Sequence, residues 1–175
     1  KIGHACAASG RNPSDVTLLA VSKTKPIEMV QQAFAAGQID FGENYLQDAV
    51  GKVQAMPKAH WHFIGQIQSN KTRAIATHFD WVHSLASEKI ARRLNNQRES
   101  STPINVLLQV NVSNDPTRGG VEAERASDLL DQVKDMQNLK PRGLMTITEN
   151  YKDPNELRRY FAKIRMLVQD LNATH

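Results

Sequence analysis

The chain has 175 residues, of which 40% are hydrophobic and 23% charged, and its formal net charge is +4. This size and composition are typical of one globular domain with a single core, and the scattered Lys and Arg argue against a nucleic-acid-binding surface. No apolar run is long enough to span a membrane, and the single cysteine, Cys6, excludes an internal disulfide. We therefore expect a cytoplasmic protein that binds neither nucleic acid nor membrane, and the start at Lys1 leads us to expect further residues upstream.

Short apolar runs alternate along the chain with longer segments of helical period. The expected strands are residues 17–23, 39–44, 61–65, 81–84, 104–112 and 142–147. Several of them are rich in Val, Ile and Leu without regular alternation, which is typical of parallel strands covered on both faces.

The segments between these strands have recognisable helix ends. Pro26 can open the first helix and Gly37 can end it, Ser87 can cap a later helix, and Asp153-Pro154 can start the last one. Strands that alternate with helices predict a parallel α/β sheet, either doubly wound or closed into a barrel. The turn after the first strand has no GxGxxG sequence, which weighs against a dinucleotide-binding fold.

Lys23 stands at the carboxyl end of the first expected strand, which is the functional edge of β/α sheets. It shares strand parity with Leu19 and Val21, so in a barrel all three would face the interior. We expect a partly desolvated lysine there, because desolvation favours the neutral amine that attacks aldehydes to form a Schiff base. The alternative is a lysine that extends to solvent, as we expect for Lys25.

The stretches LLAVSKTKP, FGENYLQDAV, WHFIGQIQSNK, FDWVHSLAS and RGLMTI, in this order and at this spacing, resemble the pyridoxal phosphate homeostasis proteins (the YggS/PROSC family). The resemblance covers about residues 13–147. It implies a TIM (β/α)8-type barrel of the alanine racemase N-terminal class, without the second domain of the racemases. It also implies that pyridoxal 5'-phosphate (PLP) binds as a Schiff base on Lys23, with no established turnover.

Barrel geometry and the resemblance together predict cofactor-binding residues at the strand ends. They are Lys23, Asn44, Gly65, His83, Ser84, Asn111 and Met145. The two asparagines could hydrogen-bond the ring hydroxyl or its surroundings, and Gly65 would allow close approach of the ring. For each residue beyond Lys23, the alternative is a loop or core residue whose polar groups are already satisfied.

Two other groups of residues could form binding sites. His60, His62, His78 and His83 suggest a metal site, but no carboxylate falls at a helpful spacing, so we expect no metal and a core position for His62. The loop of residues 113–121 could hold an anion, although a turn explains it equally well. Its Arg118-Gly119-Gly120 sequence departs from the Lys and Ser-Gly common in the family.

A larger departure lies at the end of the chain. Family members hold the phosphate with a Ser- and Gly-rich segment and place an Arg at the pyridine nitrogen, in segments that follow the position matching His175. We therefore expect residues 1–175 to form a single incomplete PLP-binding barrel domain with about six of the eight βα units. Such a chain would bind PLP weakly and reversibly, or not at all.

The function favoured by these observations is PLP binding in vitamin B6 homeostasis by a monomer that is not an enzyme. Its expected partners are PLP, related B6 vitamers and PLP-dependent apo-enzymes. The alternative is a racemase-like enzyme or Schiff-base lyase. Racemisation needs a second base, commonly Tyr, and none of Tyr45, Tyr151 and Tyr160 is well placed for that role.

Overall fold

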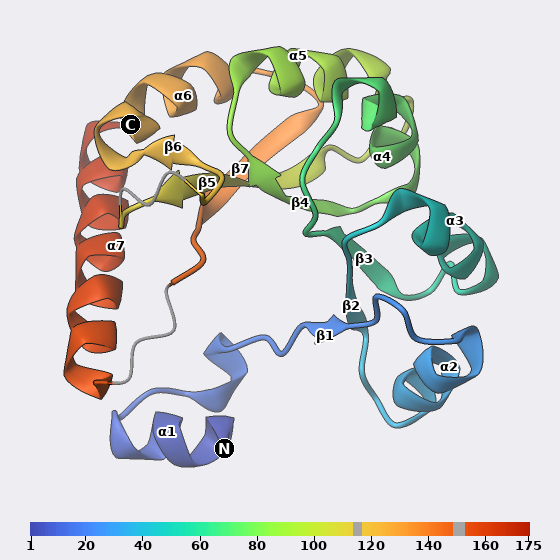
Figure 1. Cartoon of the computed structure of the whole chain (residues 1–175), viewed down its shortest axis with the longest axis horizontal. Helices are drawn as coiled ribbons and strands as arrows, with labels where there is room; N and C mark the ends of the chain where they lie inside the picture. Colours follow the sequence, from blue (N-terminus) through green and yellow to red (C-terminus); the bar gives the residue numbers. More distant parts are fainter. Residues whose placement is uncertain (114–116, 149–152) are drawn as a thin grey trace.

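The computed structural model describes residues 1–113, 117–148 and 153–175. Its centre is a 7-stranded sheet in the order β1-β2-β3-β4-β5-β6, with β7 pairing β5, and every pairing is parallel. The strands are β1 (Ala20–Val21), β2 (Asp40–Glu43), β3 (His60–Phe63), β4 (Trp81–Leu85), β5 (Ile104–Asn111), β6 (Val121–Glu122) and β7 (Leu139–Met145). Figure 1 shows them curving into an arc that does not close, with the helices outside it.

The helices begin and end largely where the sequence indicates. They are α1 (Ile2–Ala8), α2 (Ile27–Ala35), α3 (Leu46–Ala55), α4 (Thr72–His78), α5 (Glu88–Gln97), α6 (Ala126–Val133) and α7 (Pro154–Thr174). The hydroxyl of Ser87 accepts from the Ile90 amide at the start of α5, and the carboxylate of Asp153 accepts from the Asn155 amide at the start of α7. Both predicted caps are therefore confirmed. Among the described residues, no helix is long and apolar enough to cross a membrane.

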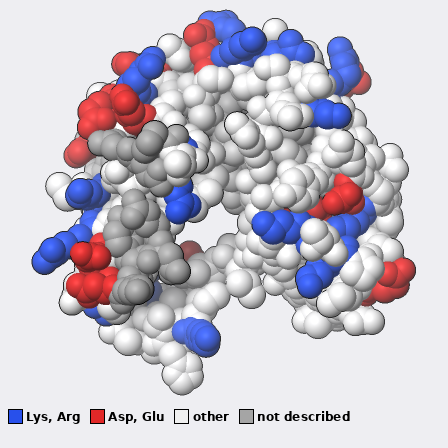
Figure 2. Space-filling model, viewed as in Figure 1, with Lys and Arg blue, Asp and Glu red and all other residues white. Residues whose placement is uncertain are grey.

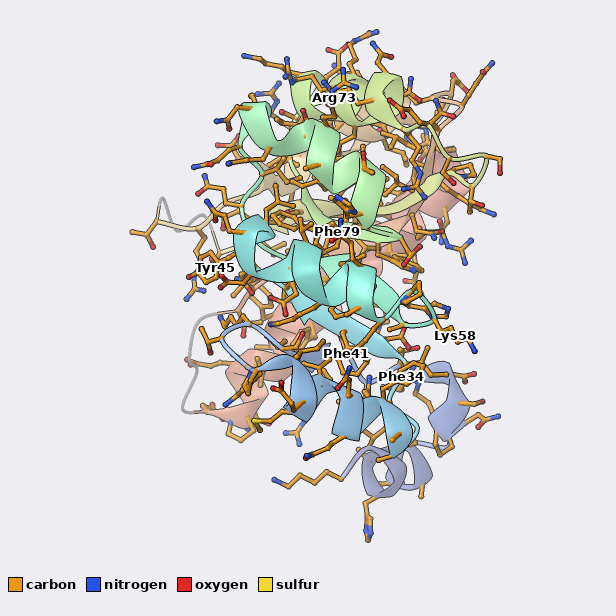
Figure 3. The ribbon with its side chains drawn as sticks, turned by 90° about the vertical axis from the view of Figure 1, so that its right-hand side faces the viewer. Phe34, Phe41, Tyr45, Lys58, Arg73 and Phe79 are labelled. Atoms are coloured by element: carbon orange, nitrogen blue, oxygen red, sulfur yellow. The ribbon has the colours of Figure 1, made fainter. Side chains whose placement is uncertain are left out.

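The hydrophobic core lies between the convex face of the sheet and the helices. Along β5, residues alternate between buried and half-buried, so that Val106 and Leu108 pack against the helices and Leu107 and Gln109 lie on the concave face. Phe41 on β2 and Phe79 after α4 belong to the same core (Figure 3). The described helices lie outside the arc and do not cover its concave inner face (Figure 1), and Figure 2 shows a hollow through the centre of the molecule. The expected barrel is therefore present as an open arc.

Some elements differ from the sequence-based expectation. The first strand was expected over residues 17–23 but pairs only over Ala20–Val21. Within residues 1–113, 117–148 and 153–175, β2 is the only strand that pairs with β1, and Leu18 remains 60% exposed. The helices α1 and α4 and the two-residue strand β6 were not predicted. These elements are short, so they carry too few apolar positions to show a period.

Helix α7 is buried only in part. Leu171 is buried, whereas Phe161 is 52% exposed and Met166 is 59% exposed. These two exposed side chains are five positions apart and so lie on different sides of the helix, and the expected monomer stays a prediction.

Candidate functional site

The carboxyl ends of β1, β2 and β3 place Lys23, Asn44 and Ile64 beside one another. The Ser22 amide donates to the Gly42 carbonyl at 3.0 Å, and the Ile64 amide donates to the Glu43 carbonyl at 2.9 Å. These bonds continue the registers Val21↔Gly42 and Glu43↔Phe63 by one residue. Ser22 and Glu43 bond to each other on the helix side of the sheet, so Asn44, which continues β2 by one residue, faces the concave side. Lys23 already lies in the turn after β1, so its inward direction stays a prediction.

Lys23 lies in a tight turn that ends the strand. The Lys25 amide donates to the Ser22 carbonyl at 3.1 Å, and Thr24, the third residue of this turn, has φ of 62°. Lys23 has a negative φ, so the turn is of type II, which normally carries Gly or Asn at its third position. Lys23 is exposed rather than partly desolvated, because β1 ends before it and no strand pairs beyond β1. Lys25 is exposed as predicted.

Asn44 and Gly65 meet in a cavity of about 470 Å³ at the same edge of the sheet. The cavity is also lined by Tyr45, Leu46, Gln47, Phe63, Gln66, Gln68 and Lys71, and Lys23 is not among its lining residues. The Oδ1 atom of Asn44 is buried and has no hydrogen-bond partner in the described part of the chain. A buried amide oxygen without a partner is costly, so this atom is suited to accept a hydrogen bond from a ligand.

The absence of a side chain at Gly65 serves the neighbouring backbone. A Cβ atom built there would lie 2.1 Å from the carbonyl oxygen of Asn44. The Gly65 carbonyl in turn accepts a hydrogen bond of 2.5 Å from the buried hydroxyl of Ser84. These contacts tie the loop after β3 to β2 and β4, so the structure assigns both residues a role in shaping the cavity wall. Their contact with a cofactor stays a prediction.

His83 lies on the concave face within a network of polar side chains. Its Nε2 is 2.9 Å from Nδ1 of His62, and Nε2 of His62 is 3.1 Å from Asp40 Oδ1. The same carboxylate lies 3.2 Å from Nδ1 of His60. His62 is buried, at 6% exposed, but it belongs to this network on the concave face and not to the hydrophobic core, so its predicted core position is wrong. No carboxylate stands at a helpful spacing in the sequence, but the parallel register brings Asp40 alongside His60. Among the described residues, no group of three ligands is arranged to hold a metal ion.

Burial lowers the pKa of two histidines in this network. Burial lowers the pKa of His83 to about 4, and the neighbouring His62 adds to the effect. Burial also lowers the pKa of His62, although its hydrogen bond to Asp40 opposes the shift. Both side chains are therefore neutral in the folded protein under conditions in which an unfolded histidine takes up a proton.

We predict that the chain loses stability as pH falls from about 6.5 to about 4. In this window the unfolded state binds more protons than the folded state, so the free energy of unfolding falls by about 1–2 kcal/mol after allowance for partial exposure. Urea unfolding across this pH range measures the slope. The change His83→Gln should reduce it, whereas His4→Gln, at an exposed position, should not. An unchanged slope in His83→Gln would contradict this account.

The remaining predicted residues lie at the ends of β5 and β7. The Nδ2 atom of Asn111 donates to the Arg118 carbonyl at 3.4 Å, and its Oδ1 accepts from the Ser113 hydroxyl at 3.2 Å. Asn111 therefore binds the loop that follows it. Met145 is half-buried at the end of β7. Residues 114–116 of the loop considered for anion binding, and Tyr151, lie outside the described part of the chain.

Three charged residues near the site were not singled out from the sequence. Glu43 is fully buried on β2 and pairs with Lys52 of α3 at 2.7 Å. Lys71, the residue before α4, lines the cavity that contains Asn44. Glu43 could have been recognised from the sequence, because an acid in the mostly apolar stretch IDFGEN indicates a buried carboxylate, which requires a partner. The lysines were not predictable, because each reaches the site from another element.

Comparison with known proteins first defines the class. A family model described as the alanine racemase N-terminal domain matches residues 6–175. Alanine racemase from Corynebacterium glutamicum superposes with a TM-score of 0.67 at 14% identity, covering 90% of this chain and 46% of that one, which supports the fold alone. The open arc of parallel strands and outer helices is thus a barrel of the alanine racemase N-terminal class.

Curated relatives then specify the family. The pyridoxal phosphate homeostasis protein of Pseudomonas aeruginosa is 50% identical over 175 residues, which is 98% of this chain and 76% of the relative. The same-named protein of Vibrio alginolyticus is 47% identical over 94% of this chain and 73% of the relative. PipY of Synechococcus elongatus with PLP bound superposes with a TM-score of 0.85 at 33% identity, covering 99% of this chain and 82% of that one. The chain belongs to the pyridoxal phosphate homeostasis proteins.

Proposed function

We propose that this chain binds PLP reversibly through a Schiff base on Lys23 and acts in PLP homeostasis without catalytic turnover. The observation that carries the proposal is the position of Lys23, an exposed residue in the turn after β1, directly after the Ser22 that bonds to Glu43, the residue before Asn44. Membership of the family and the PLP-bound relative PipY support it. PLP supplies the aldehyde with which a lysine amine condenses.

The described residues meet part of what a PLP site requires. No hydrogen bond or ion pair is found for the Lys23 ammonium in the described part of the chain, so no partner must be displaced before it meets a ligand. The unpartnered Oδ1 of Asn44 can accept from a hydroxyl of the ring. We also propose Gly65, His83, Ser84, Asn111 and Met145 as cofactor contacts.

The proposal is tested by trapping the bound cofactor. We expect PLP added to the purified chain to give a yellow species that borohydride reduces to a pyridoxyl group, located on Lys23 by mass spectrometry. The change Lys23→Ala should abolish this adduct, whereas Lys25→Ala, at the exposed lysine two residues on, should retain it. An adduct that persists in Lys23→Ala, or that spreads equally over surface lysines, would overturn the proposal.

The absence of turnover rests on the position of the tyrosines. The Tyr160 hydroxyl lies 2.6 Å from Thr146 Oγ1 and its side chain is buried, so it is not a free base. Tyr45 is exposed at the start of α3 (Figure 3) and lines the cavity that contains Asn44, whose lining residues do not include Lys23. Racemisation of D- or L-alanine, lost in Lys23→Ala, would favour the enzyme instead.

We further propose that PLP-dependent apo-enzymes receive the cofactor from this protein. We also propose a cytoplasmic location and a monomer.

A further inference from the structure

We propose that Ser22, Glu43 and Lys52 form a positioning lock that holds Lys23 and Asn44 on the concave face of the barrel; the inference rests on the function proposed above. The Lys52 ammonium donates to Glu43 Oε1 at 2.7 Å and to the Ser22 carbonyl at 2.8 Å. The Ser22 hydroxyl donates to the same carboxylate oxygen at 2.7 Å. One buried cation of α3 thus joins the ends of β1 and β2.

Burial makes this cluster unusual for a purely structural contact. Glu43 is 0% exposed, Ser22 4% and Lys52 8%. The second carboxylate oxygen of Glu43 is buried with no partner among the described residues. Apolar residues of similar volume commonly replace a buried ion pair without loss of stability, so such a pair is weak support for a stabilising role. The geometry that the pair fixes is a better explanation for its presence.

The lock determines which face Lys23 and Asn44 occupy. Ser22 follows the last residue of β1 and directly precedes Lys23, and Glu43 is the last residue of β2 and directly precedes Asn44. Neighbouring residues of a strand point to opposite faces, so fixing the first of each pair toward the helices directs the second toward the concave side. A slip of one residue would reverse both directions and turn the amine away from the site.

The same cluster also holds the turn that carries Lys23. The Ser22 carbonyl accepts from both the Lys52 ammonium and the Lys25 amide, so the peptide group between Ser22 and Lys23 is fixed at its oxygen. Thr24 has φ of 62°, a conformation that a β-branched residue adopts only when its surroundings impose it. Loss of the Lys52 contact would allow the turn to relax and Lys23 to change direction.

The test separates an effect on the direction of Lys23 from an effect on the stability of the fold. The double variant Glu43→Met/Lys52→Met removes both charges and leaves no buried charge unpaired, so its urea unfolding should match that of the wild type. We expect the rate of borohydride-trapped pyridoxyl formation on Lys23 to fall about tenfold or more, as expected when a reacting group is misplaced. In cofactor-free protein, hydrogen exchange of the Lys25 amide should accelerate by about tenfold or more because its turn is freed.

Two further variants make the outcome decisive. Ser22→Ala removes one hydroxyl of the lock and should shift both readouts in the same direction by less. Glu88→Gln/Arg92→Gln removes an ion pair on the exposed side of α5 and should leave both unchanged. Wild-type adduct rate and wild-type Lys25 protection in the lock variants would overturn the proposal. Absence of any Lys23 adduct in the wild type would refute the proposed function instead, while Lys25 exchange would still report on the lock.

Discussion

Replacing Gly65 by alanine is expected to lower the free energy of unfolding by about 3 kcal/mol, because the added methyl has no space. Its Cβ would lie 2.1 Å from the Asn44 carbonyl oxygen and 2.8 Å from the carbonyl carbon. Both neighbours are backbone atoms at the end of a paired strand, so they cannot rotate away as a flexible side chain would. Relief requires that β2 and β3 separate at the edge that carries the cavity.

Gly51→Ala is a matched control for that substitution. Gly51 lies within α3, and a Cβ atom there meets nothing within 4 Å. Alanine favours a helix over glycine by about 1 kcal/mol, so this variant should be more stable than the wild type. Urea unfolding of both variants measures the contrast. A Gly65→Ala protein as stable as the wild type would show that the loop after β3 is not held against Asn44.

Gly65 also shows what sequence reasoning could predict at this site. The pattern placed it correctly at the end of a strand facing the cavity, beside Asn44. The expected reason for a glycine, approach of a cofactor ring, stays a prediction, and the structure adds a second reason, the approach of the Asn44 backbone. Spacing along one strand indicates where a residue lies. It does not show which neighbouring strand comes closest, because that depends on register.

The network of Asp40 with His60 and His62 also depends on strand register, which spacing along one strand does not show. His60 and His62 were recognised as alternating on one strand, which their spacing alone determines. Asp40 is twenty residues earlier and was not connected with them, since only the pairing of β2 with β3 brings it alongside. Sequence therefore predicted the strands and helices that have a clear period, and the side-chain networks between them required the structure.

The length of β1 is a third feature that the local sequence pattern did not predict. The apolar residues at 17–21 indicate a strand, but only two of them pair, and Val21 is 47% exposed. A strand reaches its full length only where a neighbour satisfies its backbone, and β1 has β2 on one side alone. The lysine that follows it consequently depends on contacts other than the sheet for its orientation.

Lys52→Met alone is expected to cost about 3–5 kcal/mol, far more than loss of an ordinary surface lysine. The substitution leaves Glu43 fully buried without its cation, and the Ser22 hydroxyl is then the only remaining donor to that carboxylate among the described residues. Lys134→Met is the control, because its partner Asp131 is exposed and solvent replaces the lost contact. Urea unfolding should show a large loss in the first variant and little change in the second.

The double variant Glu43→Met/Lys52→Met should recover most of this loss, since it removes the charge that the single variant leaves unpaired. Recovery would show that the cost of Lys52→Met comes from an uncompensated carboxylate and not from packing of the Lys52 stem. Equal losses in the single and double variants would contradict that explanation. Because the buried pair then contributes little net stability, its retention beside Lys23 would be explained by the direction it gives to the amine.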